Sequence, residues 1–169
     1  MQILYGPDFK IDEPTVVAVG KFDGLHSGHI KIIEKLLQTA KSNNLKSVVY
    51  TFNINPKLVL NNESFTPLMT NEEKSQKLSL LGIDYVVYEN FNTKFADTLP
   101  EEFVRKVLIE KLNAKSVIMG ENSSFGKGGS GNAGLMNEFG NKYGFSVKVV
   151  KLIKENGVTV SSTRIREKN

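Results

Sequence analysis

Short apolar runs alternate with longer amphipathic segments along most of this chain. The apolar runs are rich in valine, isoleucine and aromatic residues, as strands covered on both faces of a parallel sheet are. They occupy residues 16–19, 46–52, 84–88, 116–119 and 145–152, and residues 3–5 are a candidate for a short leading strand. The pattern therefore predicts a sheet of about five strands.

The segments between these runs have the spacing of helices. In the first of them, which starts at Ser27, apolar side chains recur on one face and charged side chains lie outside it. The later helices are expected from Thr70 to the stop at Gly82, from Leu99 to Leu112, and over residues 132–143. Acidic residues follow Thr70 and a proline follows Leu99, and both signals are common at helix N-termini.

Strands that alternate with helices indicate an α/β fold, a three-layer α/β/α arrangement with a mostly parallel sheet. We expect one domain over residues 1–169, a length that allows a sizeable core. Ligands of such folds bind at the carboxyl ends of the strands. The turn after Val19 and the loop after Met119 both lie at such ends, so one cleft can use both.

Two stretches interrupt the alternation. Residues 53–67 are polar and contain Pro56 and Pro67, so we expect mostly loop there. Near the end of the chain, Glu155-Asn156-Gly157 predicts a hairpin turn that leads into residues 158–160.

Composition excludes several classes of protein. The apolar fraction of 40% and the charged fraction of 24% are ordinary for a soluble globular protein, and the absence of cysteine excludes disulfides and thiolate metal sites. No apolar run approaches the ~20 residues of a membrane span, and no signal peptide precedes the first strand, so we expect a cytoplasmic protein. The net charge of +4 suits a phosphorylated small molecule as well as nucleic acid, but no basic block interleaved with aromatics indicates RNA or DNA.

The candidate chemistry lies in residues 15–29, a predicted strand, glycine turn and helix start. Gly20 and Gly24 bracket the turn, at positions where a Cβ would crowd the backbone or a ligand. His26 and His29 are the only two histidines of the chain, and three-residue spacing points them the same way. The free N–H groups and partial positive charge of a helix N-terminus favour a phosphate, to which both imidazoles can donate.

This turn resembles the F-D-x-x-H-x-G-H signature of the nucleotidyltransferase superfamily, which it matches as Phe22-Asp23-Gly24-Leu25-His26-Ser27-Gly28-His29. Three longer stretches narrow the resemblance to the bacterial FAD synthetases, the FMN adenylyltransferase module of the bifunctional riboflavin kinase/FAD synthetase. They are residues 16–29 (V-x-x-G-x-F-D-G-V-H-x-G-H), 117–126 (V-G-x-D/N-F-x-F-G) and 161–166 (S-S-T-x-I-R). The riboflavin kinase domain that follows the last motif in the bifunctional enzymes is expected to be absent here.

The resemblance implies a Rossmann-like nucleotidyltransferase fold and transfer of AMP from ATP to FMN, with FAD and pyrophosphate as products. Mg²⁺ is expected to accompany the ATP, and no carboxylate cluster indicates a dedicated metal site. The implied catalytic residues are His26, His29 and Arg166. The implied ATP-binding residues are Gly20, Phe22, Gly24, His26, His29, Ser162, Thr163 and Arg166, and the implied flavin-binding residues are Phe52, Pro56, Asn122, Phe125 and Gly126.

The residue types fit this chemistry. The phosphate of FMN is largely ionised at pH 7, so the protein needs to position the reactants and stabilise charge rather than supply a strong base. Ser162 and Thr163 can cap a final helix while its N–H groups face a phosphate, and Arg166 offers a planar fork to phosphate oxygens. The amide of Asn122 can both donate and accept on the flavin side.

Three positions depart from the family pattern. Asn55 replaces the histidine of the family's F-x-P-H-P segment and Ser123 replaces an aromatic residue, both in segments near the flavin in the family. Lys21 stands where the family commonly has asparagine, and phosphate binding and a solvated side chain are equally compatible with the sequence. Two other functions stay open: transfer to another phosphorylated acceptor, such as pantetheine phosphate or nicotinamide mononucleotide, and flavin or nucleotide binding without turnover.

Three further features have structural interpretations. Residues 126–131 contain a G-x-G-x-x-G string that follows its strand too late for a dinucleotide fingerprint, so we interpret it as a flexible flap over the ligand or a plain surface loop. Asp23 is expected to hold the turn through backbone N–H groups rather than to bind a metal. Phe91, Phe95 and Phe103 have spacings typical of core packing, and we assign them no flavin role.

Overall fold

Alternating strands and helices assemble around one parallel sheet. The computed structural model describes residues 1–22, 25, 27–53, 69–151, 154–155 and 158–159. The strands of the sheet are β1 (Gln2–Tyr5), β2 (Thr15–Val19), β3 (Lys46–Phe52), β4 (Tyr85–Glu89), β5 (Ala114–Gly120) and β6 (Ser146–Val150). A separate antiparallel pair, β7 (Lys154–Glu155) and β8 (Val158–Thr159), confirms the predicted hairpin, whose turn residues 156–157 lie outside the described part.

The helices occupy the connections between strands. They are α1 (Ser27–Asn43), α3 (Asn71–Leu81), α4 (Thr93–Ala96), α5 (Pro100–Phe103) and α6 (Ala133–Tyr143). The predicted helix over residues 99–112 is helical over 100–111, but α5 passes directly into a π-helix, η2 (Val104–Lys111). A single 3-10 turn, η3 (Lys127–Gly129), precedes α6, and the short α4 has no counterpart in the sequence pattern.

The order of the strands places a switch point in the middle of the sheet. Among the described residues the sheet has six strands, all parallel, in the order β1-β4-β3-β2-β5-β6. The chain runs outward from β2 through β3 to β4 and then crosses to β5, on the other side of β2. Open α/β sheets bind ligands outside the carboxyl ends of the strands at such a reversal. The predicted α/β class is confirmed, and β1 supplies the sixth strand by pairing with β4.

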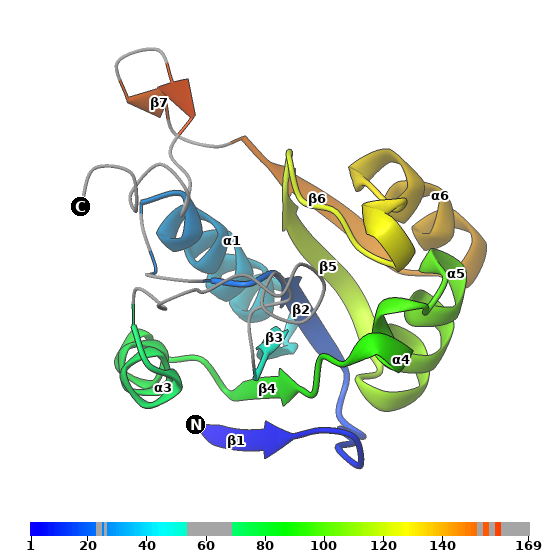
Figure 1. Cartoon of the computed structure of the whole chain (residues 1–169). Helices are drawn as coiled ribbons and strands as arrows, with labels where there is room; N and C mark the ends of the chain where they lie inside the picture. Colours follow the sequence, from blue (N-terminus) through cyan, green and yellow to red (C-terminus); the bar gives the residue numbers. More distant parts are fainter. Residues whose placement is uncertain (23–24, 26, 54–68, 152–153, 156–157, 160–169) are drawn as a thin grey trace.

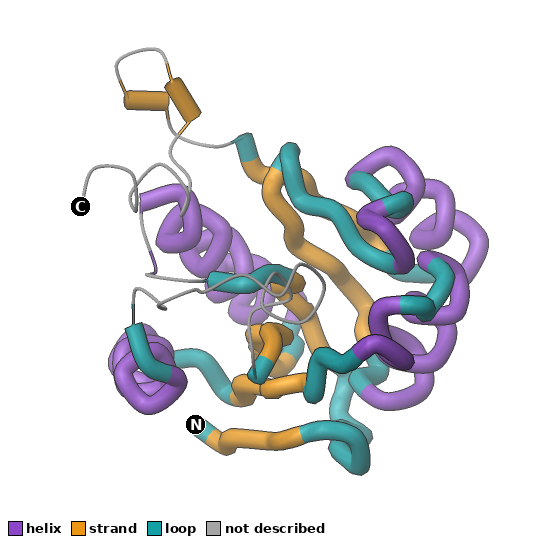
Figure 2. Tube along the Cα trace, in the orientation of Figure 1, coloured by secondary structure: helices purple, strands orange, loops and turns teal. Residues whose placement is uncertain are grey.

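Two apolar layers attach the helices to the sheet, because alternate residues of a strand face opposite sides. Val17 and Val19 belong to the layer beneath α5, η2 and α6, whereas Val16 and Ala18 belong to the layer beneath α1 and α3. Figure 1 shows α1 and α3 on one side of the strands and α4, α5 and α6 on the other. Figure 2 shows the strands as a middle layer between helices, which is the predicted three-layer arrangement.

Helix ends follow their sequence signals. Thr70 caps α3 in a reciprocal capping box with Glu73, and Gly82 ends the same helix with a left-handed φ of 94°. The Asn132 side chain caps α6 by accepting a hydrogen bond from the Leu135 N–H at 2.8 Å. Side-chain caps of this kind stabilise a helix by about 1 kcal/mol each.

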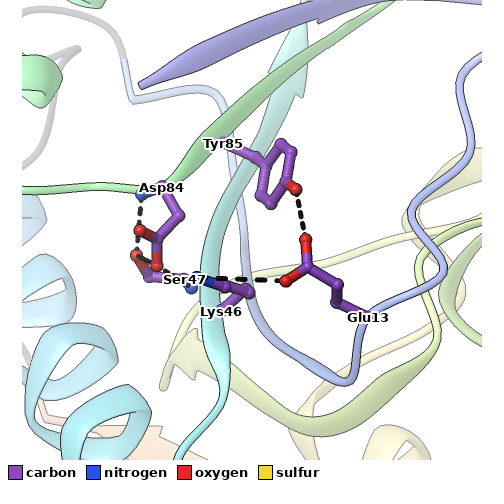
Figure 3. A network of polar contacts seen from close by, with 5 residues as sticks. All are labelled: Glu13, Lys46, Ser47, Asp84 and Tyr85. Carbon is purple, nitrogen blue, oxygen red and sulfur yellow. Dashed lines mark hydrogen bonds and ion pairs between the residues drawn. The ribbon is translucent and has the colours of Figure 1, made fainter.

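A polar network fastens the amino ends of β3 and β4 (Figure 3). The Asp84 carboxylate accepts from the Ser47 N–H at 2.9 Å, and the Asp84 N–H donates to the Ser47 hydroxyl at 2.9 Å. The Tyr85 hydroxyl donates to Glu13, whose carboxylate also lies 3.9 Å from the Lys46 ammonium. The network fixes the register of these strands at the end opposite to the switch-point crevice.

Glu89, the last residue of β4, has a buried side chain. Only 4% of the residue is exposed, and its carboxylate accepts a hydrogen bond from the Tyr50 hydroxyl at 3.1 Å. Burial raises the pKa of the Glu89 carboxyl, although the Tyr50 hydrogen bond and the Lys111 ammonium oppose the shift. Burial and the negative charge of Glu89 together raise the pKa of the Tyr50 hydroxyl well above its usual value.

We predict that Glu89→Gln gains stability relative to the wild type as the pH rises. A carboxyl with a raised folded-state pKa stabilises the fold fully below its unfolded pKa, and this contribution is lost as the pH rises through the folded pKa. Glutamine removes the charge and keeps an oxygen for Tyr50. Urea denaturation between about pH 4 and 8 should show a gain of about 1.4 kcal/mol for each unit of pKa shift.

The exposed Glu138 of α6 provides the control for this prediction. Glu138→Gln should differ from the wild type by an amount that hardly varies over the same pH range. A pH-independent difference between Glu89→Gln and the wild type would contradict the assignment of a buried charge to Glu89.

Candidate functional site

The described part of the turn that follows β2 contains buried residues with a strained backbone. Phe22 and Leu25 have φ values of 51° and 43°, in the left-handed region that residues other than glycine rarely adopt. Phe22 is fully buried and Leu25 is 7% exposed. A Cβ on Gly20 would lie 3.0 Å from the Phe22 ring. A side chain at position 20 would therefore crowd the Phe22 ring, a side-chain contact that was not among those expected from the sequence.

His29 stands beside this turn at the start of α1. Its ring is half-buried, and its centroid lies 5.3 Å from that of the Phe22 ring. The Gly20 N–H donates to the Tyr50 carbonyl at 3.1 Å, which extends the pairing of β2 with β3 into the turn. The buried Phe22 ring thus packs against this histidine, and the turn that carries Phe22 is fastened to β3.

A cavity of about 670 Å³ opens at the carboxyl ends of β2, β3 and β5. The β2–α1 turn supplies one part of its lining through Gly20, Lys21, Phe22 and His29, and β5 with the loop after it supplies another through Met119, Gly120 and residues 122–129. The expectation that both segments share one cleft is confirmed. The volume lies in the range of small-molecule sites.

Five phenylalanines form an aromatic wall of the cavity: Phe52, Phe91, Phe95, Phe103 and Phe125. Ring centroids of neighbours are 5.3 Å apart for Phe52 and Phe91, and 5.9 Å apart for Phe52 and Phe95. Most of these pairs meet edge to face, the favoured geometry for aromatic rings. The aromatic wall is therefore a packed apolar surface suited to a planar aromatic ligand.

The glycine-rich loop after β5 is tied to the segment that precedes α5. Phe125 pairs with Gly131 in an antiparallel bridge, and the Lys127 N–H donates to the Thr98 carbonyl at 2.8 Å. A Cβ on Gly126 would lie 2.7 Å from Pro100, so the two segments touch at this glycine. Residues 126–129 line the cavity. The loop therefore forms an anchored wall of the cavity while residues 127–130 stay exposed at the surface, and both interpretations, a flap and a surface loop, remain open.

Seven predicted site residues fall within the described part of the chain, and all seven line this cavity. They are Gly20, Phe22, His29, Phe52, Asn122, Phe125 and Gly126. The other predicted site residues, Gly24, His26, Pro56, Ser162, Thr163 and Arg166, lie outside the described residues, as do Asp23 and Asn55. The structure therefore brings the described candidates for the nucleotide and for the flavin to one cavity.

Sequence reasoning missed part of the aromatic wall. Phe103 is 3% exposed and belongs to the core as expected, but Phe91 and Phe95 are only half-buried and line the cavity. A positional signal existed, because Phe91 lies two residues beyond the carboxyl end of β4. Side chains that follow such an end lie on the ligand side of a parallel sheet.

The described ranges contain neither a metal-binding cluster nor a membrane-spanning helix. There, no three histidine, aspartate or glutamate side chains gather into a metal-binding group. Within the same ranges no helix has the length and apolar character needed to cross a membrane.

The family model and the similar proteins point to the same family. The family model for FAD synthetase matches residues 8–164. The chain is 34% identical over 160 residues to a bifunctional riboflavin kinase/FMN adenylyltransferase of Buchnera aphidicola subsp. Schizaphis graminum, covering 94% of this chain and 51% of that protein. It is 31% identical over 156 residues to the Escherichia coli K12 protein of the same name, covering 92% and 50%.

A FAD synthetase of Listeria monocytogenes is 32% identical over 162 residues, covering 93% of this chain and 64% of that protein. The chain spans about half the length of the first relatives it matches, at 51% and 50%. These matches support the resemblance drawn from the sequence motifs.

Two solved structures resemble this fold. A crystal structure described as a macrolide-efflux protein of Streptococcus pneumoniae superposes with a TM-score of 0.86 at 26% identity, covering 99% of this chain and 55% of that one. A pantoate-beta-alanine ligase of Francisella tularensis superposes with a TM-score of 0.56 at 16% identity, covering 92% of this chain and 66% of that one. The second likeness concerns the fold alone.

We predict that Gly126→Ala destabilises the protein more than Gly128→Ala. Both glycines have positive φ, at 76° and 62°, but only Gly126 would place a new Cβ against Pro100, whereas nothing lies within 4 Å at Gly128. Backbone strain alone costs about 1–2 kcal/mol, and the clash at Gly126 adds about 1–3 kcal/mol. Chemical denaturation of both variants measures the difference, and equal losses would mean that the loop does not press on Pro100.

Proposed function

This chain belongs to the FAD synthetase family, and on that premise we propose that it transfers the AMP group of ATP to FMN. A phosphate oxygen of FMN attacks the α-phosphorus of ATP, and the bond from that phosphorus to the bridging oxygen of the β-phosphate breaks. FAD and pyrophosphate are the products. The observation that carries the proposal is the single cavity in which the His29 turn and the aromatic wall are both exposed to one ligand space.

The nucleotide half of the proposal rests on the β2–α1 turn. α1 has 17 residues and presents the N–H groups of its first turn beside His29, where a helix N-terminus favours phosphate. His29 is proposed to donate a hydrogen bond to the ATP phosphates as charge develops on them. His26, Ser162, Thr163 and Arg166 join this half as proposals from the family motifs.

The flavin half rests on the aromatic wall and the loop after β5. The isoalloxazine ring is planar and apolar on its faces, so the phenylalanines of the wall can bury it by stacking or edge contacts. Asn122 is exposed at the cavity lining, where its amide can donate to and accept from the ring's polar edge. Ser123 lines the same cavity in place of the family's aromatic residue. Pro56 belongs to this half from the family motif alone.

We propose that ATP enters as its Mg²⁺ complex. No group of three acidic or histidine side chains occurs in the described ranges to hold the ion by itself. Phosphate oxygens and water would then be its main ligands, as is usual for Mg²⁺ at nucleotide sites.

The proposal is tested by incubating the chain with ATP, Mg²⁺ and a panel of acceptors, with products identified by mass. We expect FAD and pyrophosphate from FMN, and no product from riboflavin, because riboflavin carries no phosphate to attack the α-phosphorus. Pantetheine phosphate and nicotinamide mononucleotide are the competing acceptors. If the chain used either of them and not FMN, the acceptor in the proposal would be wrong. If it bound ligands without releasing pyrophosphate, it would be a binding protein.

A second prediction concerns His29. If it stabilises developing charge, His29→Ala should lower kcat by about 10² or more, comparable to the loss of an oxyanion donor. Lys31 is exposed on the same helix, and Lys31→Ala should keep the wild-type rate. Circular dichroism checks that both variants fold. A folded His29→Ala enzyme with normal kcat would remove His29 from the catalytic residues.

A further inference from the structure

Lys74 is the only buried lysine in the part of the chain that the structure describes. It belongs to α3, is 5% exposed, and does not line the cavity. Its ammonium donates a hydrogen bond at 3.0 Å to the carbonyl oxygen of Lys21, which lies in the β2–α1 turn. Burying a cation is costly unless hydrogen bonds or opposite charges compensate it, and this hydrogen bond is one such compensation.

The Lys21 carbonyl is held by a second donor as well. The hydroxyl of Thr51, a fully buried residue of β3, donates to the same oxygen at 2.8 Å. A carbonyl oxygen has two lone pairs, so side chains from α3 and β3 together can occupy both. One peptide unit of the turn is thereby tied to two separate elements of the fold.

This peptide unit immediately precedes the strained residue of the turn. The peptide bond that carries the Lys21 carbonyl joins Lys21 to Phe22. The left-handed φ of 51° at Phe22 is disfavoured for a bulky side chain. The C=O and N–H of a trans peptide point in opposite directions, so holding the Lys21 oxygen toward α3 turns the Phe22 N–H away from it. The Phe22 ring in turn packs against the His29 ring, with their centroids 5.3 Å apart. The Lys74 contact therefore stabilises the turn conformation that sets His29.

We propose that Lys74 is a positioning residue for nucleotide binding: it fixes the Lys21 carbonyl and through it the strained turn, in which Phe22 packs against the His29 ring that faces ATP. The role rests on the proposed adenylyl transfer, and Lys74 acts without touching the substrate. A charged donor fixes a carbonyl more strongly than a neutral one, which accounts for a lysine beside Thr51.

The central test replaces Lys74 with methionine, which has similar length and no charge. We expect the KM for ATP to rise about tenfold to a hundredfold, the range expected for loss of a charge-assisted hydrogen bond, with a smaller change in kcat. FMN affinity measured without nucleotide should change less than about twofold. Lys77→Met is the matched control, because Lys77 is exposed on the same helix.

A double-mutant cycle separates positioning from general stability. Thr51→Val removes the other donor while keeping the shape of the side chain, so its effect on ATP affinity should not add to that of Lys74→Met. Hydrogen exchange of a peptide covering residues 15–30 should accelerate in both variants and not in Lys77→Met. If Lys74→Met does not fold, Thr51→Val and Lys74→Arg carry the same comparison, with Arg expected to recover ATP affinity.

The outcomes distinguish the two proposals. ATP titration by calorimetry needs no acceptor, so Lys74-dependent ATP affinity in a chain that makes no FAD would overturn adenylyl transfer to FMN and keep the positioning role. FAD synthesis with unchanged ATP KM in folded Lys74→Met would overturn the positioning role alone. Lower stability with normal ATP affinity, or additive effects with Thr51→Val, would also overturn it.

Discussion

The conformation of the β2–α1 turn is the constraint on which the rest of the site depends. Between β2 and α1, the described residues include Phe22 and Leu25, which are left-handed and buried. Such a turn is stable only when its surroundings determine it, and here β3, α3 and α1 all contact it. The strain lies at the carboxyl end of β2, beside the cavity, where a rigid turn can present His29 and a helix N-terminus.

The position of the aromatic wall likewise depends on side chains packed beneath it. The centroid of the Tyr50 ring lies 5.8 Å from that of Phe52 and 5.6 Å from that of Phe103. The Tyr50 hydroxyl donates to the buried Glu89 carboxylate. A buried carboxylate is costly, and Glu89 does not line the cavity, so its role is to hold Tyr50 rather than a ligand. In both the aromatic wall and the β2–α1 turn, the side chain of a buried ionisable residue, Glu89 or Lys74, forms a hydrogen bond that supports residues lining the cavity.

Much of the fold could be predicted because its signals are local. The valine-rich run of β2, the capping box at Thr70 and the Asn132 cap each specify an element from a few neighbouring residues. The site was predictable where it coincides with a motif, as at Gly20, Phe22 and His29. The position of Phe91 and Phe95 at the cavity was not predictable from their spacing, because an apolar aromatic has the same spacing whether it packs in a core or faces a cavity. Lys74 gave no signal, since an exposed and a buried lysine look alike in a helix.

The sequence by itself determined the alternation of strands and helices, the ends of most elements and the family of this chain. Its local patterns act over a few residues, and they are the same in any arrangement of the elements. Tertiary structure alone decided the strand order, the meeting of the turn after β2 with the loop after β5, and the approach of Lys74 to Lys21 across 53 positions of sequence. Those contacts depend on how the helices pack on the sheet, which is a property of the whole core rather than of any segment.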